Sequence, residues 1–303
     1  MIELYLDASG LINETAWKER IAVLHKQTQA ESTLTKESAQ IETLQRVLRD
    51  AVRSRISGRF GLLLSGGVDS SLLALLCKEH QADFVCYNVG IQGSPDVEAA
   101  QIAASMLNLR LKQRIFTIDE LEQLFRRAAQ ILPIVDVVSL GVAAVEIAAV
   151  ELAQQDGTNI LMGGLGSEEI FAGYERHAHA AEVNAECWQG LENMYVRDLV
   201  RDAAVAKHCG VQFVTPFLDS ELIVAAMRIP GSGKIAKGEK KVILRKTAES
   251  LGLPKEISWR KKHAAQYGSR FDAVLEKLAK RAGMGKQQYV QTLIPTVPAS
   301  RTN

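Results

Sequence analysis

A glycine-rich turn between an apolar strand and an apolar helix is the feature that most constrains the fold of this chain. Residues 60–64 form a short apolar run, which is typical of a strand buried in a parallel sheet. The run ends at Ser65-Gly66-Gly67, and residues 70–79 follow with the composition of an apolar helix. Strand, tight turn and helix in succession are the repeating unit of α/β folds. We therefore expect an open parallel sheet with helices on both faces.

The same alternation continues along the chain. Apolar runs at residues 84–89, 110–116 and 159–162 predict three more strands, and a helical pattern follows each of them. Beyond about residue 175 the strand signals nearly vanish, so we expect a mainly helical lobe packed on the sheet. The predicted organisation is an N-terminal extension at 1–36, a domain at 37–282 (sheet core 58–175, helical lobe 176–282) and a loose tail at 283–303.

Charge and composition disfavour several classes of partner. The 36 basic residues nearly balance the 35 acidic residues, so no surplus of charge favours nucleic acid or an anionic membrane. The N-terminus lacks a signal-peptide pattern, and no run approaches the ~20 apolar residues that span a bilayer. The four cysteines form no CxxC pair, which indicates structural thiols in a reducing compartment. We expect a cytoplasmic protein without a membrane or nucleic-acid partner.

The first glycine-rich turn has the chemistry of a phosphate site. Gly66 and Gly67 lack a Cβ, so their amides can approach a phosphate closely, and the following helix adds its positive end. Asp69 suits this place if Mg²⁺ lies between its carboxylate and the phosphates. A plain glycine turn with a serine cap is the alternative, which the full SGGVDSS at a strand-to-helix turn disfavours. The nucleotide-binding candidates here are Leu64, Ser65, Gly66, Gly67, Asp69, Ser70 and Ser71.

This turn matches neither GxxxxGK[ST] nor GxGxxG, so it is not a Walker-type or a dinucleotide-binding loop. SGGVDSS at residues 65–71 instead resembles the PP-loop signature of N-type ATP pyrophosphatases, which cleave ATP to AMP and pyrophosphate. That superfamily includes synthetases of GMP, NAD, argininosuccinate and asparagine, and tRNA thiolases. Further motifs are needed to choose among them.

Four more segments resemble the synthetase domain of asparagine synthetase. Residues 89–101 (VGIQGSPDVEAAQ) resemble VGLxGSPDxxAA, and residues 163–174 (GGLGSEEIFAGY) resemble SGEGSDExFxGY. Residues 215–219 (TPFLD) resemble VPFLD, and residues 241–262 resemble a K-x-x-LR segment that leads to WRxK. Together the resemblance spans about residues 38–275 in the expected order.

The resemblance implies a nucleotide site between two glycine loops. Val89, at the end of the second strand, would lie at the edge of the adenine. Gly163 and Gly164 would form the second loop at the same crevice, where open α/β sheets bind ligands. The implied cofactors are ATP and Mg²⁺.

The catalytic candidates are Asp69, Glu168, Lys241 and Ser139. Glu168 would join Asp69 in holding Mg²⁺, although an acid that only favours a helix start is the alternative. Lys241 matches the family lysine that meets the phosphates, although basic residues on helices are often merely solvated.

The chain departs from the family pattern at three places. The family's glutaminase half needs a cysteine directly after the initiator methionine, and Ile2 stands here. We therefore expect ammonia or another amine as the nitrogen source, free or delivered by a separate amidotransferase subunit. Leu165 replaces the glutamate of SGEGSDE, and Gln212 and Val214 replace two charged residues before PFLD. We expect retained adenylation with altered acceptor chemistry.

The leading hypothesis is an amide ligase that activates a small-molecule carboxylate as its acyl-adenylate and passes it to an amine. One alternative is a PP-loop enzyme that modifies tRNA or nucleobases, which the absence of CxxC and of a basic surplus disfavours. Another is a non-catalytic ATP-binding regulatory protein, which Leu165 favours and the retained Asp69, Glu168 and Lys241 disfavour. The chain is also a candidate for a homodimer.

Overall fold

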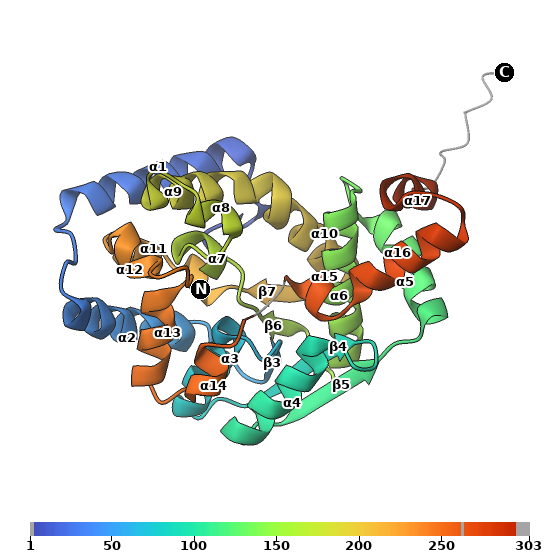
Figure 1. Ribbon diagram of the computed structural model, residues 1–303, viewed down its shortest axis with the longest axis horizontal. Helices are drawn as coiled ribbons and strands as arrows, with labels where there is room; N and C mark the ends of the chain where they lie inside the picture. Colours follow the sequence, from blue (N-terminus) through green and yellow to red (C-terminus); the bar gives the residue numbers. More distant parts are fainter. Residues whose placement is uncertain (1–2, 262–263, 295–303) are drawn as a thin grey trace.

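A parallel sheet forms the centre of the molecule, which the computed structural model describes over residues 3–261 and 264–294 (Figure 1). The strands are β3 (Phe60–Leu63), β4 (Phe84–Gly90), β5 (Leu111–Ile115), β6 (Ile160–Met162) and β7 (Gln212–Val214). They lie in the order β5-β4-β3-β6-β7, and each neighbouring pair is parallel. The predicted α/β class with an open parallel sheet is confirmed.

The sheet also contains a strand that the sequence does not predict. β7 pairs with β6, and Val214 lies opposite Met162. Val214 is the one buried residue of β7, so the apolar run that marks a buried strand is missing. The prediction that the sheet core ends at residue 175 is therefore wrong, because the mainly helical lobe contributes this edge strand.

Helices account for most of the remaining chain (Figure 1). They are α1 (Glu14–Ala30), α2 (Glu37–Arg53), α3 (Val68–Glu79), α4 (Pro95–Leu107), α5 (Ile118–Ile131), α6 (Val137–Gln154), α7 (Ser167–Ile170), α8 (Glu175–Ala178), α9 (Val183–Met194), α10 (Val200–Cys209), α11 (Ser220–Met227), α12 (Gly231–Lys234), α13 (Val242–Ser250), α14 (Lys255–Ser258), α15 (Ala265–Gly268), α16 (Phe271–Arg281) and α17 (Lys286–Leu293). A π-helical turn, η1 (Tyr195–Leu199), joins α9 to α10, and a 3-10 turn, η2 (Pro216–Leu218), precedes α11.

The two faces of the sheet have separate apolar cores. Phe84 and Cys86 of β4 pack with buried residues of α2 and α3, while Val85 and Tyr87 pack with buried residues of α5 and α6. Successive residues of a strand point to opposite faces, so β4 contributes to both layers. The continuous apolar run of this strand thus follows from helices on both faces.

The segment at residues 3–30, which we expect to be an extension, packs into the body of the protein. It begins with a small hairpin of β1 (Leu6–Asp7) and β2 (Gly10–Leu11). Trp17 of α1 is fully buried, and its indole N–H donates to the Leu191 carbonyl at 2.9 Å. The Tyr5 hydroxyl donates to the Phe213 carbonyl of β7 at 3.2 Å. The N-terminal segment therefore covers the edge of the sheet opposite β5.

The predicted loose tail at 283–303 begins with an ordered helix. α17 buries Tyr289, Val290 and Leu293 in the core that α5, α6 and α16 share. This apolar face explains why the chain stays packed beyond residue 283. The remainder of the predicted tail, residues 295–303, lies outside the described residues.

α6 is the one helix in the described part of the chain that is long and apolar enough to cross a membrane by length and composition. More than half of it, 56%, is buried inside the protein. Buried alanines such as Ala143, Ala144 and Ala148 let neighbouring helices approach it closely. A core helix has the same composition as a membrane span, so packing explains the apolar character of α6.

Candidate active site

The first glycine loop follows β3 and opens α3, as the sequence predicts. Gly66 has a φ of +69°, and a Cβ on it would lie 2.4 Å from the Ala99 backbone of α4. Only glycine fits both this backbone conformation and this close approach. The Ser65 amide donates to Ser70 Oγ at 3.1 Å, which closes the loop on itself. The Asn88 side chain donates to the Leu64 carbonyl at 2.8 Å and so ties the loop to β4.

The second glycine loop lies against the first. It runs from β6 through Gly163 and Gly164 into α7. A Cβ on Gly164 would lie 3.2 Å from Asp69 Cβ, so the two loops are in close contact. Gly166 precedes α7 with a φ of +96°, a conformation that favours glycine. The carboxyl ends of β3 and β6 therefore bring both loops to one place.

Lys241 connects the two loops. Its ammonium lies 2.8 Å and 2.9 Å from the two oxygens of Asp69 and 2.8 Å from Glu168 Oε1. The ammonium also donates to Ser167 Oγ at 3.0 Å. Three of the four predicted catalytic residues, from α3, α7 and the start of α13, thus meet at one point.

The Lys241 ammonium is a fixed positive charge. Its side chain is 5% exposed, and burial alone would lower its pKa. The adjacent carboxylates of Asp69 and Glu168 outweigh burial, so the pKa of Lys241 is raised. Lys241 also has a φ of +58°, which is unusual for lysine and is typical of constrained functional sites.

Ser139 and Val89 lie on other elements than the residues around Lys241, namely α6 and β4. Ser139 lies in the first turn of α6, where its hydroxyl donates to Asp136 Oδ2 at 2.5 Å. Asp136 also accepts from the amides of Val138 and Ser139, so Ser139 serves the start of this helix. Val89 lies near the end of β4 with its side chain buried in the core, which leaves its backbone as the group available to a base.

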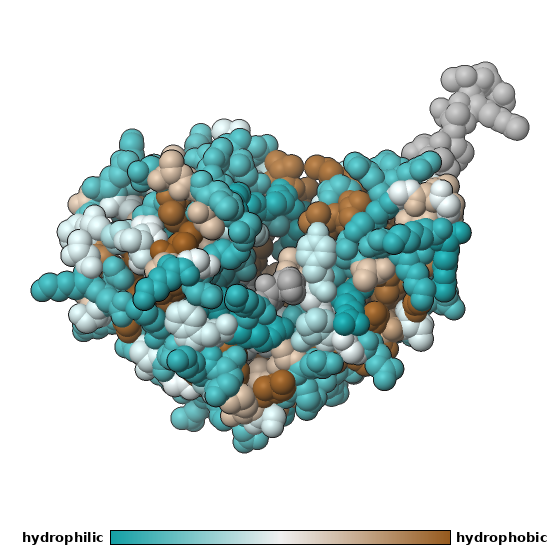
Figure 2. All heavy atoms as spheres, viewed as in Figure 1, coloured by the Kyte–Doolittle hydropathy of each residue, from teal (hydrophilic) through white to brown (hydrophobic). Residues whose placement is uncertain are grey.

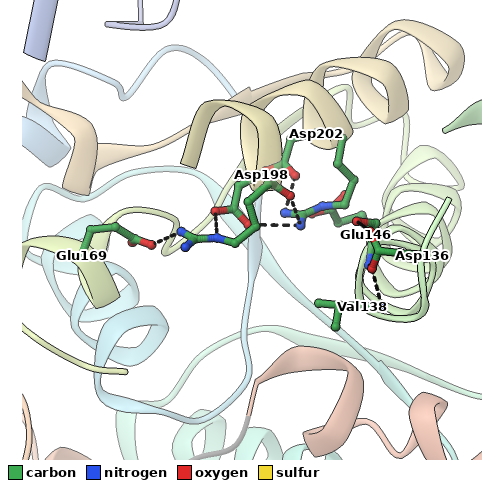
Figure 3. A network of polar contacts seen from close by, with 9 residues as sticks. Asp136, Val138, Glu146, Glu169, Asp198 and Asp202 are labelled. Carbon is green, nitrogen blue, oxygen red and sulfur yellow. Dashed lines mark hydrogen bonds and ion pairs between the residues drawn. The ribbon is translucent and has the colours of Figure 1, made fainter. Parts of the chain in front are cut away.

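A network of buried charges, which the sequence does not reveal, extends from α7 (Figure 3). Glu169 is 1% exposed, and Arg197 Nη2 lies 2.5 Å from its Oε1. Arg197 Nε donates to Asp198 Oδ2 at 2.7 Å. Burial, and then the charge of Asp198, raises the pKa of Glu169 to about 7.

The network continues to the interface of α6 and α10 (Figure 3). Arg201 contacts Asp198 at 3.2 Å, Asp202 at 2.6 Å and Glu146 at 3.5 Å. Burial raises the pKa of both Glu146 and Asp202, and the negative charge of Asp202 raises the pKa of Glu146 further. Two arginines thus hold four carboxyl groups that come from three separate parts of the chain.

The π-helical turn η1 creates this arrangement. It contains both Arg197 and Asp198 and widens the helix between α9 and α10. π-helical turns are rare and occur often at functional sites. The sequence pattern Arg201-Asp202 marks the region, but no sequence signal marks the turn itself.

Two further arginines, Arg245 and Arg260, hold the segment that follows α14. Arg245 of α13 donates to the Ser258 carbonyl at 2.5 Å, and Arg260 lies 2.7 Å from Asp96 Oδ1 in the first turn of α4. Lys261 is largely exposed and lies 4.0 Å from Glu239, while Lys262 is outside the described residues. Arg260 therefore ties this segment to α4, the helix that contacts the first glycine loop at Ala99.

The donor set at the two loops suits Mg²⁺ in the presence of phosphates. Within residues 3–261 and 264–294 no group of three or more His, Cys, Asp or Glu side chains could hold a metal. Asp69 and Glu168, however, both approach one ammonium group within 2.9 Å. Mg²⁺ commonly binds one or two carboxylates and takes its other ligands from water and phosphate. The pair fits that requirement.

The face that carries these loops is hollowed near its middle. Figure 2 shows the hollow, and Figure 1 places α7 on one side of it and α15 on the other. Glu168 is 33% exposed and Arg197 is 34% exposed, so both remain accessible next to buried partners. The carboxylate of Glu168, which contacts the Lys241 ammonium, is therefore accessible from solvent.

Comparisons with known proteins identify relatives of one kind. The sequence model of the family described as asparagine synthase matches residues 43–186 and 176–292. A putative glutamine-hydrolysing asparagine synthetase of Methanocaldococcus jannaschii is 31% identical over 287 residues, which cover 82% of this chain and 53% of that protein. Asparagine synthetase B of Escherichia coli is 29% identical over 240 residues, which cover 72% of this chain and 43% of that protein. The chain spans about half the length of these curated relatives.

Among solved structures, the NMN synthetase of Francisella tularensis overlaps 86% of this chain and 93% of its own. The sequence identity is 14% and the TM-score is 0.42.

Proposed function

Because this chain belongs to the asparagine synthase family, we propose that it is an ATP-dependent carbon–nitrogen ligase that forms AMP and pyrophosphate. The observation that carries the proposal is Lys241, which is held between Asp69 and Glu168 where two glycine loops meet. This arrangement offers a positive charge, two carboxylates and a helix N-terminus to a triphosphate.

The proposed reaction has two steps. A carboxylate oxygen of the substrate attacks the α-phosphorus of ATP, which forms the acyl-adenylate and releases pyrophosphate. An amine then attacks the acyl carbon, loses a proton and displaces AMP, which leaves the amide. Negative charge grows on pyrophosphate in the first step, and the preorganised Lys241 ammonium and the start of α3 stabilise that charge.

Asp69 and Glu168 would hold Mg²⁺, which neutralises phosphate charge when it is bound. The backbone at Leu64 and Ser65, the hydroxyls of Ser70 and Ser71, and Gly66 and Gly67 would surround the phosphates. Val89 would contact the adenine, and Gly163 and Gly164 would line the opposite side. The first loop keeps close contact with Ala99, so it is preorganised for the nucleotide.

The amine donor in this proposal is ammonia or a small amine. The proposed sources are free ammonia and ammonia delivered by a separate amidotransferase subunit. We propose that the protein is cytoplasmic and acts in amino-acid biosynthesis. A homodimer stays a prediction.

The experiment that tests this function is pyrophosphate release from ATP by the purified chain. The assay uses a panel of amino acids and other small carboxylates, with and without ammonium and with and without Mg²⁺. We expect release that requires a particular carboxylate and Mg²⁺, at about 1 per second for the best substrate. Carboxylate-independent ATP hydrolysis, or tight ATP binding without turnover across the panel, would contradict the proposal.

Leu165 in the second glycine loop bears on the choice of substrate. Its side chain is half-buried and packs against the main apolar core. A carboxylate at this position would be charged next to the reacting groups, whereas leucine forms an apolar wall. We propose that the acyl substrate is less polar than aspartate.

We expect Leu165→Glu to raise aspartate-dependent pyrophosphate release by about tenfold, because it returns a charged group to the pocket. The measurement is kcat/KM with aspartate and ammonium for both proteins. Leu165→Met, which conserves volume and polarity, is the matched control and should leave the aspartate rate within about twofold. Efficient asparagine formation by the unmodified chain would show that Leu165 does not redirect the substrate.

A further inference from the structure

Gly173 lies directly against the ion pair of Lys241 and Glu168. A Cβ on Gly173 would lie 1.6 Å from Glu168 Oε2 and 2.4 Å from Lys241 Cε. Both separations are far below any van der Waals contact, so no side chain fits while the ion pair keeps its place. Gly173 is absent from the residues with positive φ, so space and not backbone conformation requires glycine here.

The backbone of Gly173 is itself fixed to Glu168. The Gly173 amide donates to the Glu168 carbonyl at 2.8 Å, at the end of the short helix α7. Glu168 therefore contacts Gly173 twice: its carbonyl accepts the Gly173 amide, and its carboxylate lies against the Gly173 Cα. Because Gly173 has this anchor, it cannot move away to make room for an added methyl group without loss of the hydrogen bond.

We propose that Gly173 is a positioning residue, whose missing side chain leaves the slot in which the Glu168 carboxylate reaches the Lys241 ammonium. For turnover this inference rests on the proposed ligase function, but the steric relation itself does not. Glu168 occupies the aspartate position of the pattern SGEGSDE and is one methylene longer than aspartate. The slot at Gly173 accommodates this extra length.

An alanine at residue 173 is expected to displace the Glu168 carboxylate and leave the fold intact. The Glu168 side chain is 33% exposed, so it has solvent to turn into. Lys241 would then keep Asp69 and Ser167 as partners and would lose its second carboxylate. Charge near the phosphates would shift by more than 1 Å, which is enough to lower turnover strongly.

The test is a double-mutant cycle with Gly173→Ala, Glu168→Asp and the two combined. We expect Gly173→Ala to lower pyrophosphate release about 100-fold. Glu168→Asp alone should lower it as well, because the shorter acid does not reach Lys241. In the Gly173→Ala background, however, Glu168→Asp should raise release by about tenfold, because the shorter side chain clears the new methyl group.

The same cycle is measured by thermal unfolding without nucleotide. Gly173→Ala should lower the melting temperature by about 5 °C, and Glu168→Asp should restore most of that loss. Gly190→Ala on α9 is the matched control, because its Cβ would meet the flexible end of Arg176 at 3.2 Å and no part of Lys241 or Glu168. This control should leave release within about twofold of the unmodified chain.

Two results would overturn the inference. The first is a Gly173→Ala protein with unchanged release and unchanged melting temperature. The second is a combined variant no better than Gly173→Ala in either measurement, including the case in which neither protein folds. If the unmodified chain releases no pyrophosphate with any carboxylate, the proposed function fails, and the unfolding cycle still decides the role of Gly173.

Discussion

Asp69→Asn is expected to lower Mg²⁺-dependent pyrophosphate release by about 1000-fold while the protein stays folded. Asparagine has nearly the shape of aspartate and still accepts a hydrogen bond from Lys241, but it removes the charge that would bind the metal. Glu168 remains as a partner of the buried ammonium at 2.8 Å, which limits the loss of stability. The measurement is release as a function of Mg²⁺ concentration, together with thermal unfolding of both proteins.

Asp50→Asn is the matched control for this change. Asp50 lies on the exposed side of α2 and meets Arg46 at 3.5 Å, where an ion pair contributes little. The control should leave release within about twofold. Release by Asp69→Asn within about threefold of the unmodified protein would exclude a direct role of this carboxylate in ATP turnover.

Arg201→Leu is expected to lower the free energy of unfolding by about 3–5 kcal/mol. The Arg201 side chain is 6% exposed and faces Asp198, Asp202 and Glu146. Its loss would leave these buried carboxyl groups without their shared cation. The melting temperature should fall by roughly 10 °C.

The destabilisation should depend on pH. Burial raises the pKa of Glu146 and Asp202 in the folded protein, so the folded state binds more protons than the unfolded state. Such groups favour folding at low pH, and their contribution is lost as pH rises toward the raised pKa. Loss of Arg201 raises both pKa values further. The gap in melting temperature between the two proteins should therefore be larger at about pH 8 than at about pH 5.5.

Arg127→Leu is the matched control for Arg201→Leu. Arg127 is 52% exposed and pairs with Glu151 at 2.5 Å on the surface. It should change the free energy of unfolding by less than about 1 kcal/mol at either pH. If Arg201→Leu also changed the free energy of unfolding by less than about 1 kcal/mol, Arg201 would not hold the buried network. A gap in melting temperature that is larger at about pH 5.5 than at about pH 8 would lead to the same conclusion.

The strands show where sequence reasoning succeeds. β3 and β4 are buried on both sides, so they appear in the sequence as continuous apolar runs. β7 has an exposed Gln212 and a half-buried Phe213, and it is held by its pairing with β6 and by contacts with the N-terminal segment and α10. A three-residue edge strand carries too few residues for a periodic signal, so its existence depends on tertiary contacts.

The residues of the candidate site also fall into two groups: those in local sequence motifs, and those that only the tertiary structure brings together. Asp69, Glu168 and Lys241 belong to local motifs, so the sequence points to them although about 170 residues separate the first from the last. Arg197 and Asp198 come together with Glu169 through a π-helical turn, which no residue pattern marks. The predicted catalytic residue Ser139 lies at the start of α6, where its hydroxyl donates to Asp136, the residue that caps this helix.

The contact between the N-terminal segment and β7 can form only late in synthesis, because its two sides lie far apart in the sequence. Tyr5 bonds a carbonyl 208 residues later, and Glu3 accepts from Thr215 at a separation of 212 residues. At a translation rate of about 5–20 residues per second, the first segment waits about 10–40 s for these partners. During that time the apolar side of α1, with Trp17 and Ile21, lacks its packing partners α9 and α11. Ribosome-bound chains shorter than about 215 residues should therefore depend on chaperones that shield this helix.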